Sequence, residues 1–182
     1  VEALGKNFDL IVCTGVLHHL VDPDKGLEAL RSVLKPDGAL YLMVYAPYGR
    51  AGVYLLQDYC RSLGIGTSVQ EIDDLATVVE ALPPQHPLVT LLRNSRDALN
   101  PAALADALLN PRDRAYSVPQ LFDFLGRNSL TLGRWYRQAP YLPQCGSIAA
   151  TPHAARLVEL PENERYAAME LLRGTMTCHS VI

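Results

Sequence analysis

The most strongly patterned stretch of the chain is FDLIVCTGVLHHLVDPDKGLEALRSVLKPDGALYLMVYAP, residues 8–47. It opens with FDLIVC (8–13), a short apolar run rich in β-branched residues, which is typical of a strand buried on both faces of a parallel sheet. It closes with ALYLMVYAP (39–47), a second run of the same kind. The stretch therefore predicts two buried strands.

The segment between these strands has the pattern of an amphipathic helix. Apolar residues recur at helical spacing within residues 24–35, and Asp22 or Asp24 is available as the N-cap. The sequence KPDG (35–38) predicts a turn that ends this helix. Strand, helix, turn and strand form a βαβ unit with a right-handed crossover, so the predicted fold class is α/β.

The middle of the chain, residues 50–110, has helical patterns and no convincing strand pattern. Because each piece is short, we interpret this segment as a helical insertion rather than a separate domain. The helices are expected at residues 51–63, 71–82, 87–95 and 101–109.

The last third of the chain returns to α/β order. Ser117 is placed to cap a helix over residues 118–127, and residues 130–138 alternate imperfectly like a strand. A helix is expected over residues 161–174, with Pro161 at its start and Gly174 at its end, and residues 175–182 begin another strand.

Composition narrows the function classes. A chain of 182 residues has room for one domain, and its net charge of −3 argues against a nucleic-acid partner. No apolar run is long enough to cross a bilayer, so we expect no membrane association. The four cysteines are scattered without a CxxC pair, which is typical of reduced thiols in a cytoplasmic protein.

The combination of an FD-apolar strand, the loop VLHHL, a helix, the turn LKPDG and a second strand closely resembles class I S-adenosylmethionine-dependent methyltransferases. The resemblance is strong over residues 8–47 and looser over residues 117–137 and 162–182. It implies a Rossmann-like methyltransferase sheet of strand order 3-2-1-4-5-7-6. Residues 8–13 and 39–47 would be its fourth and fifth strands, and residues 130–138 and 176–182 its last two.

The same resemblance implies that residues 1–182 are a partial methyltransferase domain, namely its C-terminal half with an insertion at about 50–110. The family builds its glycine-rich loop and its ribose and adenine contacts in the N-terminal half, and no GxGxG occurs in this sequence. We therefore expect a fragment that is inactive alone. We also expect the strand at 8–13 to expose an apolar edge.

The strand order of the family places the cofactor. In an open parallel sheet the ligand crevice forms outside the carboxyl ends of the strands, where strand order reverses. The loop that leaves residues 8–13 opens onto that point. S-adenosylmethionine is thus the expected cofactor, and the residues expected to contact it are Cys13, Thr14, Gly15, Val16 and Leu17. A purely connecting role for this loop is the alternative.

His19 and then His18 are the candidates for general base. Methyl transfer from a sulfonium needs positioning first, and it needs a base only if the acceptor loses a proton. An imidazole titrates near neutral pH and suits that role. The alternative is that one histidine caps or packs beneath the following helix. We predict no metal site, because HExxH is absent and Cys178 and His179 would point to opposite faces of a strand.

The acceptor side is less clearly marked. Aromatic and basic residues follow the second strand and recur in the polar loop NPRDRAYSVP (110–119), where they would suit an anionic or aromatic small molecule. The alternative is that Arg112 and Arg114 pair with Asp113 or Asp123. The predicted substrate-binding residues are Tyr45, Tyr48, Arg50, Arg114 and Tyr116.

Two functions follow from these patterns. One is a methyltransferase that acts on an unidentified acceptor, with a small molecule favoured. The other is a catalytically silent, methyltransferase-like binding module or accessory subunit. The retained TGVLHHL loop (14–20) favours the enzyme.

Overall fold

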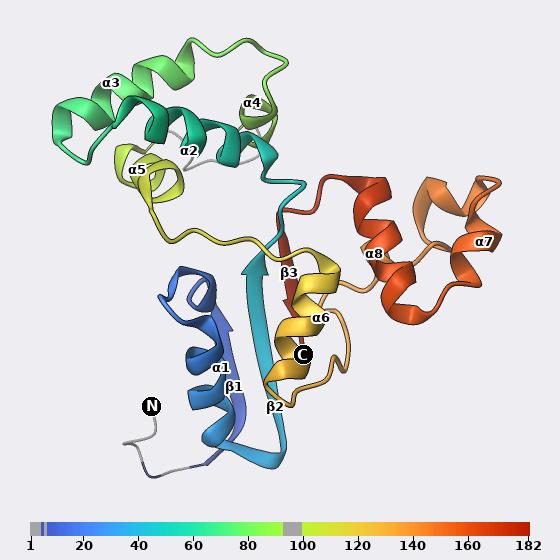
Figure 1. Ribbon diagram of the computed structural model, residues 1–182. Helices are drawn as coiled ribbons and strands as arrows, with labels where there is room; N and C mark the ends of the chain where they lie inside the picture. The colour runs from blue at the N-terminus through green and yellow to red at the C-terminus, as the bar shows by residue number, and fades with distance from the viewer. Residues whose placement is uncertain (1–4, 6, 93–99) are drawn as a thin grey trace. The chain divides into compact units, whose positions relative to one another are not determined.

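The computed structural model describes residue 5, residues 7–92 and residues 100–182 (Figure 1). The chain forms two compact units. The sheet unit consists of Val1–Tyr48 and Arg114–Ile182, and the helical unit consists of Gly49–Asp113.

Two parallel strands joined by a helix form the start of the sheet unit. Strand β1 (Phe8–Thr14) pairs in parallel with β2 (Leu34–Tyr45), with Ile11 opposite Leu40. Helix α1 (Pro23–Ser32) lies between them in the chain. Asp22 caps this helix, because the Asp22 carboxylate accepts a hydrogen bond of 3.0 Å from the Lys25 N–H. The predicted βαβ unit and the α/β class are confirmed.

The predicted turn at 35–38 is wrong. The helix already ends at Ser32, and residues 35–38 lie within β2. Phe8 pairs with Leu34 whereas Leu10 pairs with Ala39, so two steps along β1 accompany five along β2. The KPDG segment therefore bulges out of the ladder while staying extended, which accommodates a proline that cannot donate a ladder hydrogen bond.

Strand β3 (Cys178–Val181) completes a sheet of order β1-β2-β3 among the described residues. It runs antiparallel to β2, with His179 opposite Val44. The segment predicted as a strand at 130–138 pairs with β3 only over a short length. An isolated antiparallel bridge joins Trp135 to Val181, and backbone hydrogen bonds of 2.8–3.0 Å connect residues 133–136 with residues 180–182.

Helices α1 and α6 (Val118–Arg127) cover the same face of the sheet (Figure 1). The core between the layers is built from Leu27 of α1, Leu42 and Val44 of β2, and Phe124 of α6. Helix α6 begins as predicted, since the Gln120 side chain accepts a hydrogen bond of 2.8 Å from the Ser117 N–H. The remaining helices of this unit are α7 (Ala154–Val158), α8 (Glu162–Arg173) and the 3₁₀ turns η2 (Leu17–His19), η3 (Ala139–Tyr141) and η4 (Gly146–Ala150).

One face of β1 has no covering layer among the described residues. Leu10 and Val12 are 60% and 63% exposed, whereas Cys13 is buried. Because alternate residues point to opposite faces, Leu10 and Val12 belong to the face away from the core. The expectation that this strand is buried on both faces is therefore wrong for this structure.

The helical unit has a core of its own. It contains α2 (Ala51–Leu63), α3 (Val69–Glu80), α4 (Pro87–Leu92) and α5 (Pro101–Leu109). Its buried residues are Val53, Leu56, Cys60, Leu75, Val79, Leu88, Leu104 and Leu108. Residues 93–95, at the end of the helix expected over 87–95, lie outside the described residues. That this unit is an insertion in a methyltransferase domain stays a prediction.

Helices α2 and α4 approach each other at Gly52. A Cβ atom at this position would lie 2.1 Å from the backbone nitrogen of Leu88. Only glycine permits this separation.

No helix in the described parts of the chain is both long and apolar enough to span a membrane.

Candidate functional site

The loop that follows β1 turns sharply at its carboxyl end. Gly15 has φ +69°, in the left-handed region that side chains other than glycine rarely adopt. The next residues form η2 (Leu17–His19). The loop therefore leaves the strand at the sheet edge where the sequence predicts the cofactor.

The predicted cofactor-binding residues divide into two groups. Cys13 and Leu17 are buried in the core, and burial raises the pKa of the Cys13 thiol. Thr14 is exposed, and Val16 is 48% exposed. Cys13 and Leu17 therefore anchor the loop. Of the five predicted residues, only Thr14, Gly15 and Val16 are accessible to a ligand. Their role as cofactor contacts stays a prediction.

The rings of the two histidines pack against each other and against Tyr45 at the end of β2. The centroid of the His18 ring lies 4.2 Å from that of His19 and 4.0 Å from that of Tyr45. The His19 and Tyr45 centroids are 5.6 Å apart. Because β1 and β2 are parallel, their carboxyl ends meet at one edge, and this brings the loop residues against Tyr45. The imidazole of His18 is buried, while that of His19 is half-buried.

The segment 114–117 returns the chain to the same edge. The Tyr116 N–H donates to the Tyr45 carbonyl at 2.8 Å, and Ala115 forms an isolated parallel bridge with Tyr45. The Tyr116 ring packs into the core at 5.0 Å from the Phe124 ring, and burial raises the pKa of its phenol, partly offset by a hydrogen bond with Arg114. Tyr116 thus positions the segment, and its predicted contact with substrate stays a prediction.

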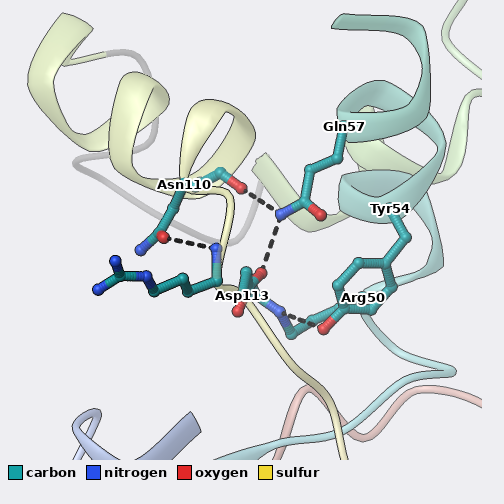
Figure 2. Close-up of polar contacts among 7 residues, drawn as sticks. Arg50, Tyr54, Gln57, Asn110 and Asp113 are labelled. Carbon is teal, nitrogen blue, oxygen red and sulfur yellow. Dashed lines mark hydrogen bonds and ion pairs between the residues drawn. The ribbon is translucent and has the colours of Figure 1, made fainter. Parts of the chain in front are cut away.

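Arg50, another predicted substrate residue, lies in the helical unit and forms an ion pair there (Figure 2). Its guanidinium contacts the Asp113 carboxylate at 3.0 Å and donates to the Tyr54 hydroxyl at 3.3 Å. Burial alone would lower the pKa of Arg50, but the hydrogen bond with Tyr54 and the charge of Asp113 raise it. Asp113 therefore pairs with Arg50, and not with Arg112 or Arg114 as the alternative sequence interpretation had it.

Gln57 joins this cluster and is a residue that the sequence interpretation missed. Its side-chain amide donates to the Asp113 carboxylate at 3.0 Å and to the Ala107 carbonyl at 2.8 Å (Figure 2). Arg50, Tyr54 and Gln57 are spaced four and three positions apart, which places them on one face of a helix. That spacing is the signal that could have found them.

Two predicted substrate residues remain. Tyr48 is 42% exposed, and the side chain of Arg114 forms a hydrogen bond with the side chain of Tyr116.

Similar sequences and folds occur in known proteins. Residues 1–40 match a family described as a methyltransferase domain. The chain is 31% identical over 189 residues to the uncharacterized protein syc1184_c of Synechococcus sp. (strain ATCC 27144 / PCC 6301 / SAUG 1402/1), covering 97% of this chain and 44% of that protein.

Solved structures share the fold. PKMT2 from Rickettsia typhi superposes with a TM-score of 0.69 at 16% identity, over 97% of this chain and 35% of that one. The same protein in complex with AdoHcy gives a TM-score of 0.68 at 18% identity, over 100% of this chain and 36% of that one. The chain thus spans less than half the length of the proteins it matches. It shares the fold of PKMT2, and residues 1–40 carry the sequence pattern of a methyltransferase domain.

Proposed function

We propose that this chain contributes to an enzyme that transfers a methyl group from S-adenosylmethionine to an acceptor. The observation that carries the proposal is the loop Thr14–His19, which stands at the carboxyl end of β1 beside Tyr45 at the end of β2. In open α/β sheets this edge is where ligands bind. A structural neighbour with the same fold was solved with AdoHcy.

The residues present suit part of the cofactor site. Gly15 in its left-handed conformation brings backbone to the surface, and Val16 offers an exposed apolar side chain. Cys13 and Leu17 hold the loop from beneath, so their share in binding would come through their backbone. When bound, S-adenosylmethionine supplies an electrophilic methyl group on a sulfonium, and the task of this chain is to fix the geometry of the transfer.

Of the two histidines, His19 is the better candidate for a general base. The His18 ring packs between the rings of His19 and Tyr45, with centroids about equally far from both, which is the environment of a structural aromatic. His19 is half-buried. A general base contributes roughly 100- to 10,000-fold to a rate.

For the acceptor we propose a small molecule, contacted by Tyr45, Tyr48 and Arg114. Tyr116 would support it indirectly, because its ring is packed against Phe124. Arg50 is paired with Asp113 inside the helical unit. The free state of all four cysteines supports a cytoplasmic location.

The proposal is tested by calorimetric titration with S-adenosylhomocysteine of a protein in which residues 1–182 are joined to the N-terminal half that the resemblance implies, comparing Gly15→Ala with Gly64→Ala. Both glycines have a left-handed backbone, with φ +69° and +65°, so both substitutions strain the chain similarly. We expect only Gly15→Ala to weaken binding, by about tenfold or more. Equal affinities for the two variants would remove this loop from the cofactor site.

The base is tested once an acceptor is known. Incubating the protein and methyl-labelled S-adenosylmethionine with a small-molecule extract identifies that acceptor by its label. His19→Ala should then lower turnover by at least about 100-fold while leaving S-adenosylhomocysteine affinity within a few-fold. Turnover close to that of the parent makes His19 a structural residue.

The alternative function is a catalytically silent binding module with the same fold. It predicts S-adenosylhomocysteine binding without a labelled product from any extract. The labelling experiment therefore separates the two functions.

A further inference from the structure

Three buried polar side chains form a continuous relay in the sheet unit. The Tyr141 hydroxyl, from η3, lies 2.6 Å from His179 Nδ1, and His179 is a residue of β3. His179 Nε2 lies 3.0 Å from Glu170 Oε1 on α8. His179 and Glu170 are 0% and 1% exposed, and Trp135 stacks on the Tyr141 ring at 3.6 Å. We call these three residues the buried relay.

The two hydrogen bonds of the relay meet on the ring of His179. Burial raises the pKa of Tyr141 strongly, so its hydroxyl keeps its proton. The hydroxyl and the carboxylate each contact one ring nitrogen of His179, and which atom donates at Nδ1 depends on the tautomer of the imidazole.

The second carboxylate oxygen of Glu170 is hydrogen-bonded to a segment that contacts the candidate site. Glu170 Oε2 accepts a hydrogen bond of 2.7 Å from the N–H of Val118, the first residue of α6. Two residues earlier, the Tyr116 N–H donates to the Tyr45 carbonyl at 2.8 Å. The carboxylate is therefore linked through the backbone of residues 116–118 to the tyrosine that packs against His18.

The buried relay is also connected to Tyr45 through the pairing of β3 with β2. His179 pairs with Val44 on the ladder, directly before Tyr45, and the Ala46 N–H donates to the Thr177 carbonyl at 3.0 Å. Glu170 is the one carboxylate, among the described residues, whose recorded hydrogen bonds join β3 to the start of α6. A buried carboxylate that serves two donors holds both in place more firmly than neutral hydrogen bonds would.

We propose that Glu170 is a positioning residue for the candidate site: it fixes segment 115–118, and through it Tyr45 and the two histidines packed against Tyr45, while His179 and Tyr141 hold the carboxylate itself. This inference rests on the proposed function, because it assigns Glu170 to the site in which S-adenosylmethionine would bind.

The experiment compares three variants of the protein that also contains the N-terminal half of the domain, as in the test of the proposed function. Glu170→Met keeps the length of the side chain and removes both acceptor oxygens. Glu170→Gln keeps one acceptor oxygen for two donors. Glu164→Gln is the matched control, because Glu164 lies on the same helix with its side chain exposed. The readouts are hydrogen exchange of the Tyr116 amide and the affinity for S-adenosylhomocysteine.

We expect Glu170→Met to speed exchange of the Tyr116 amide at least tenfold and to weaken S-adenosylhomocysteine binding by about tenfold. Exchange in α1 should stay as in the parent, since a general loss of stability would accelerate it as well. Glu170→Gln should lie between Glu170→Met and the parent, and Glu164→Gln should match the parent. If Glu170→Met does not fold, the Glu170→Gln values decide alone.

Two results overturn the proposal. One is a Tyr116 amide whose exchange is unchanged in both Glu170 variants. The other is faster exchange with unchanged affinity, which would disconnect the segment from the site. A parent protein that does not bind S-adenosylhomocysteine contradicts the proposed function instead, and the exchange data then show by themselves whether Glu170 fixes the segment.

Discussion

The sheet unit and the helical unit complete their cores in different ways. The helical unit surrounds its apolar residues with four helices from one continuous stretch, Gly49–Asp113, and ties the two ends of that stretch together by the Arg50–Asp113 ion pair. The sheet unit draws its core from both ends of the described chain and leaves Leu10 and Val12 exposed on β1. Substitutions in the helical unit should therefore act locally, while the sheet unit depends on contacts between residues far apart in sequence.

The largest effect is expected from Asp113→Ala. Removing the carboxylate leaves the partly buried guanidinium of Arg50 and the amide of Gln57 without their shared acceptor. Loss of one partner of such a pair costs about 3 kcal/mol or more of unfolding free energy. Urea denaturation measures this value, and Asp58→Ala is the control, because the Asp58–Arg61 pair is exposed and contributes little.

An Asp113→Ala variant as stable as Asp58→Ala would show that the ends of the helical unit are held by its apolar core alone.

Gly52→Ala should come next. Its methyl group would collide with the backbone of Leu88, and separating α2 from α4 should cost about 1–3 kcal/mol. Gly126→Ala, in α6 of the sheet unit, meets nothing within 4 Å and should gain up to about 1 kcal/mol from helix propensity. Melting temperatures of the two variants should thus move in opposite directions, and a shift of the same sign would contradict the close approach at Gly52.

Alkaline pH should weaken the sheet unit more than the helical unit. Burial raises the pKa values of Tyr116, Tyr141 and Tyr166, all in the sheet unit. A folded-state pKa above the unfolded value means that the folded protein keeps a proton which the unfolded chain loses. The stability from these groups is complete below about pH 10 and is lost as pH rises above it.

For Tyr141 the loss amounts to at most about 1.4 kcal/mol per pH unit, and Tyr141→Phe should remove it. Hydrogen exchange at pH values near 10 follows the two units separately. Parallel loss of protection in both units would contradict the assignment.

The smallest effect is expected from Leu10→Ser. Because Leu10 is 60% exposed, the substitution should change the unfolding free energy by less than about 0.5 kcal/mol, whereas Leu42→Ala, in the core opposite Cys13, should cost about 2–5 kcal/mol. Thermal denaturation of both variants measures the two changes in unfolding free energy, which can then be compared. A large loss with Leu10→Ser would show that this face of β1 is covered.

The parts of the fold that sequence predicted well are those in which local pattern and tertiary packing agree. The helix after Asp22 satisfies both, and Ser117 is the N-cap of α6 as expected. The run FDLIVC forms the predicted strand, but only one of its faces is buried. The prediction was wrong where pattern and packing disagree. KPDG has strong turn propensity, yet the pairing of Leu34 and Ala39 with β1 on either side of it keeps it within β2. Of residues 130–138, only the part around Trp135 pairs with β3.

The candidate site shows the same division. The convergence of the loop after β1 with Tyr45 follows from parallel topology and was predictable. The partners of Asp113 and of His179 were not, because Gln57 is 56 positions from Asp113 and Tyr141 is 38 from His179. No local pattern encodes a hydrogen bond over such separations.

The Arg50–Asp113 contact has one more consequence. Two residues 63 positions apart in sequence meet within 3.0 Å, so the chain enters and leaves the helical unit at nearly the same point. A change in the number of residues between them, by loss of a helix or growth of a loop, would leave the distance between Arg50 and Asp113 unaltered. Evolution or a protein engineer can thus vary the length of this region, or replace it by a short linker, at little cost in loop-closure entropy.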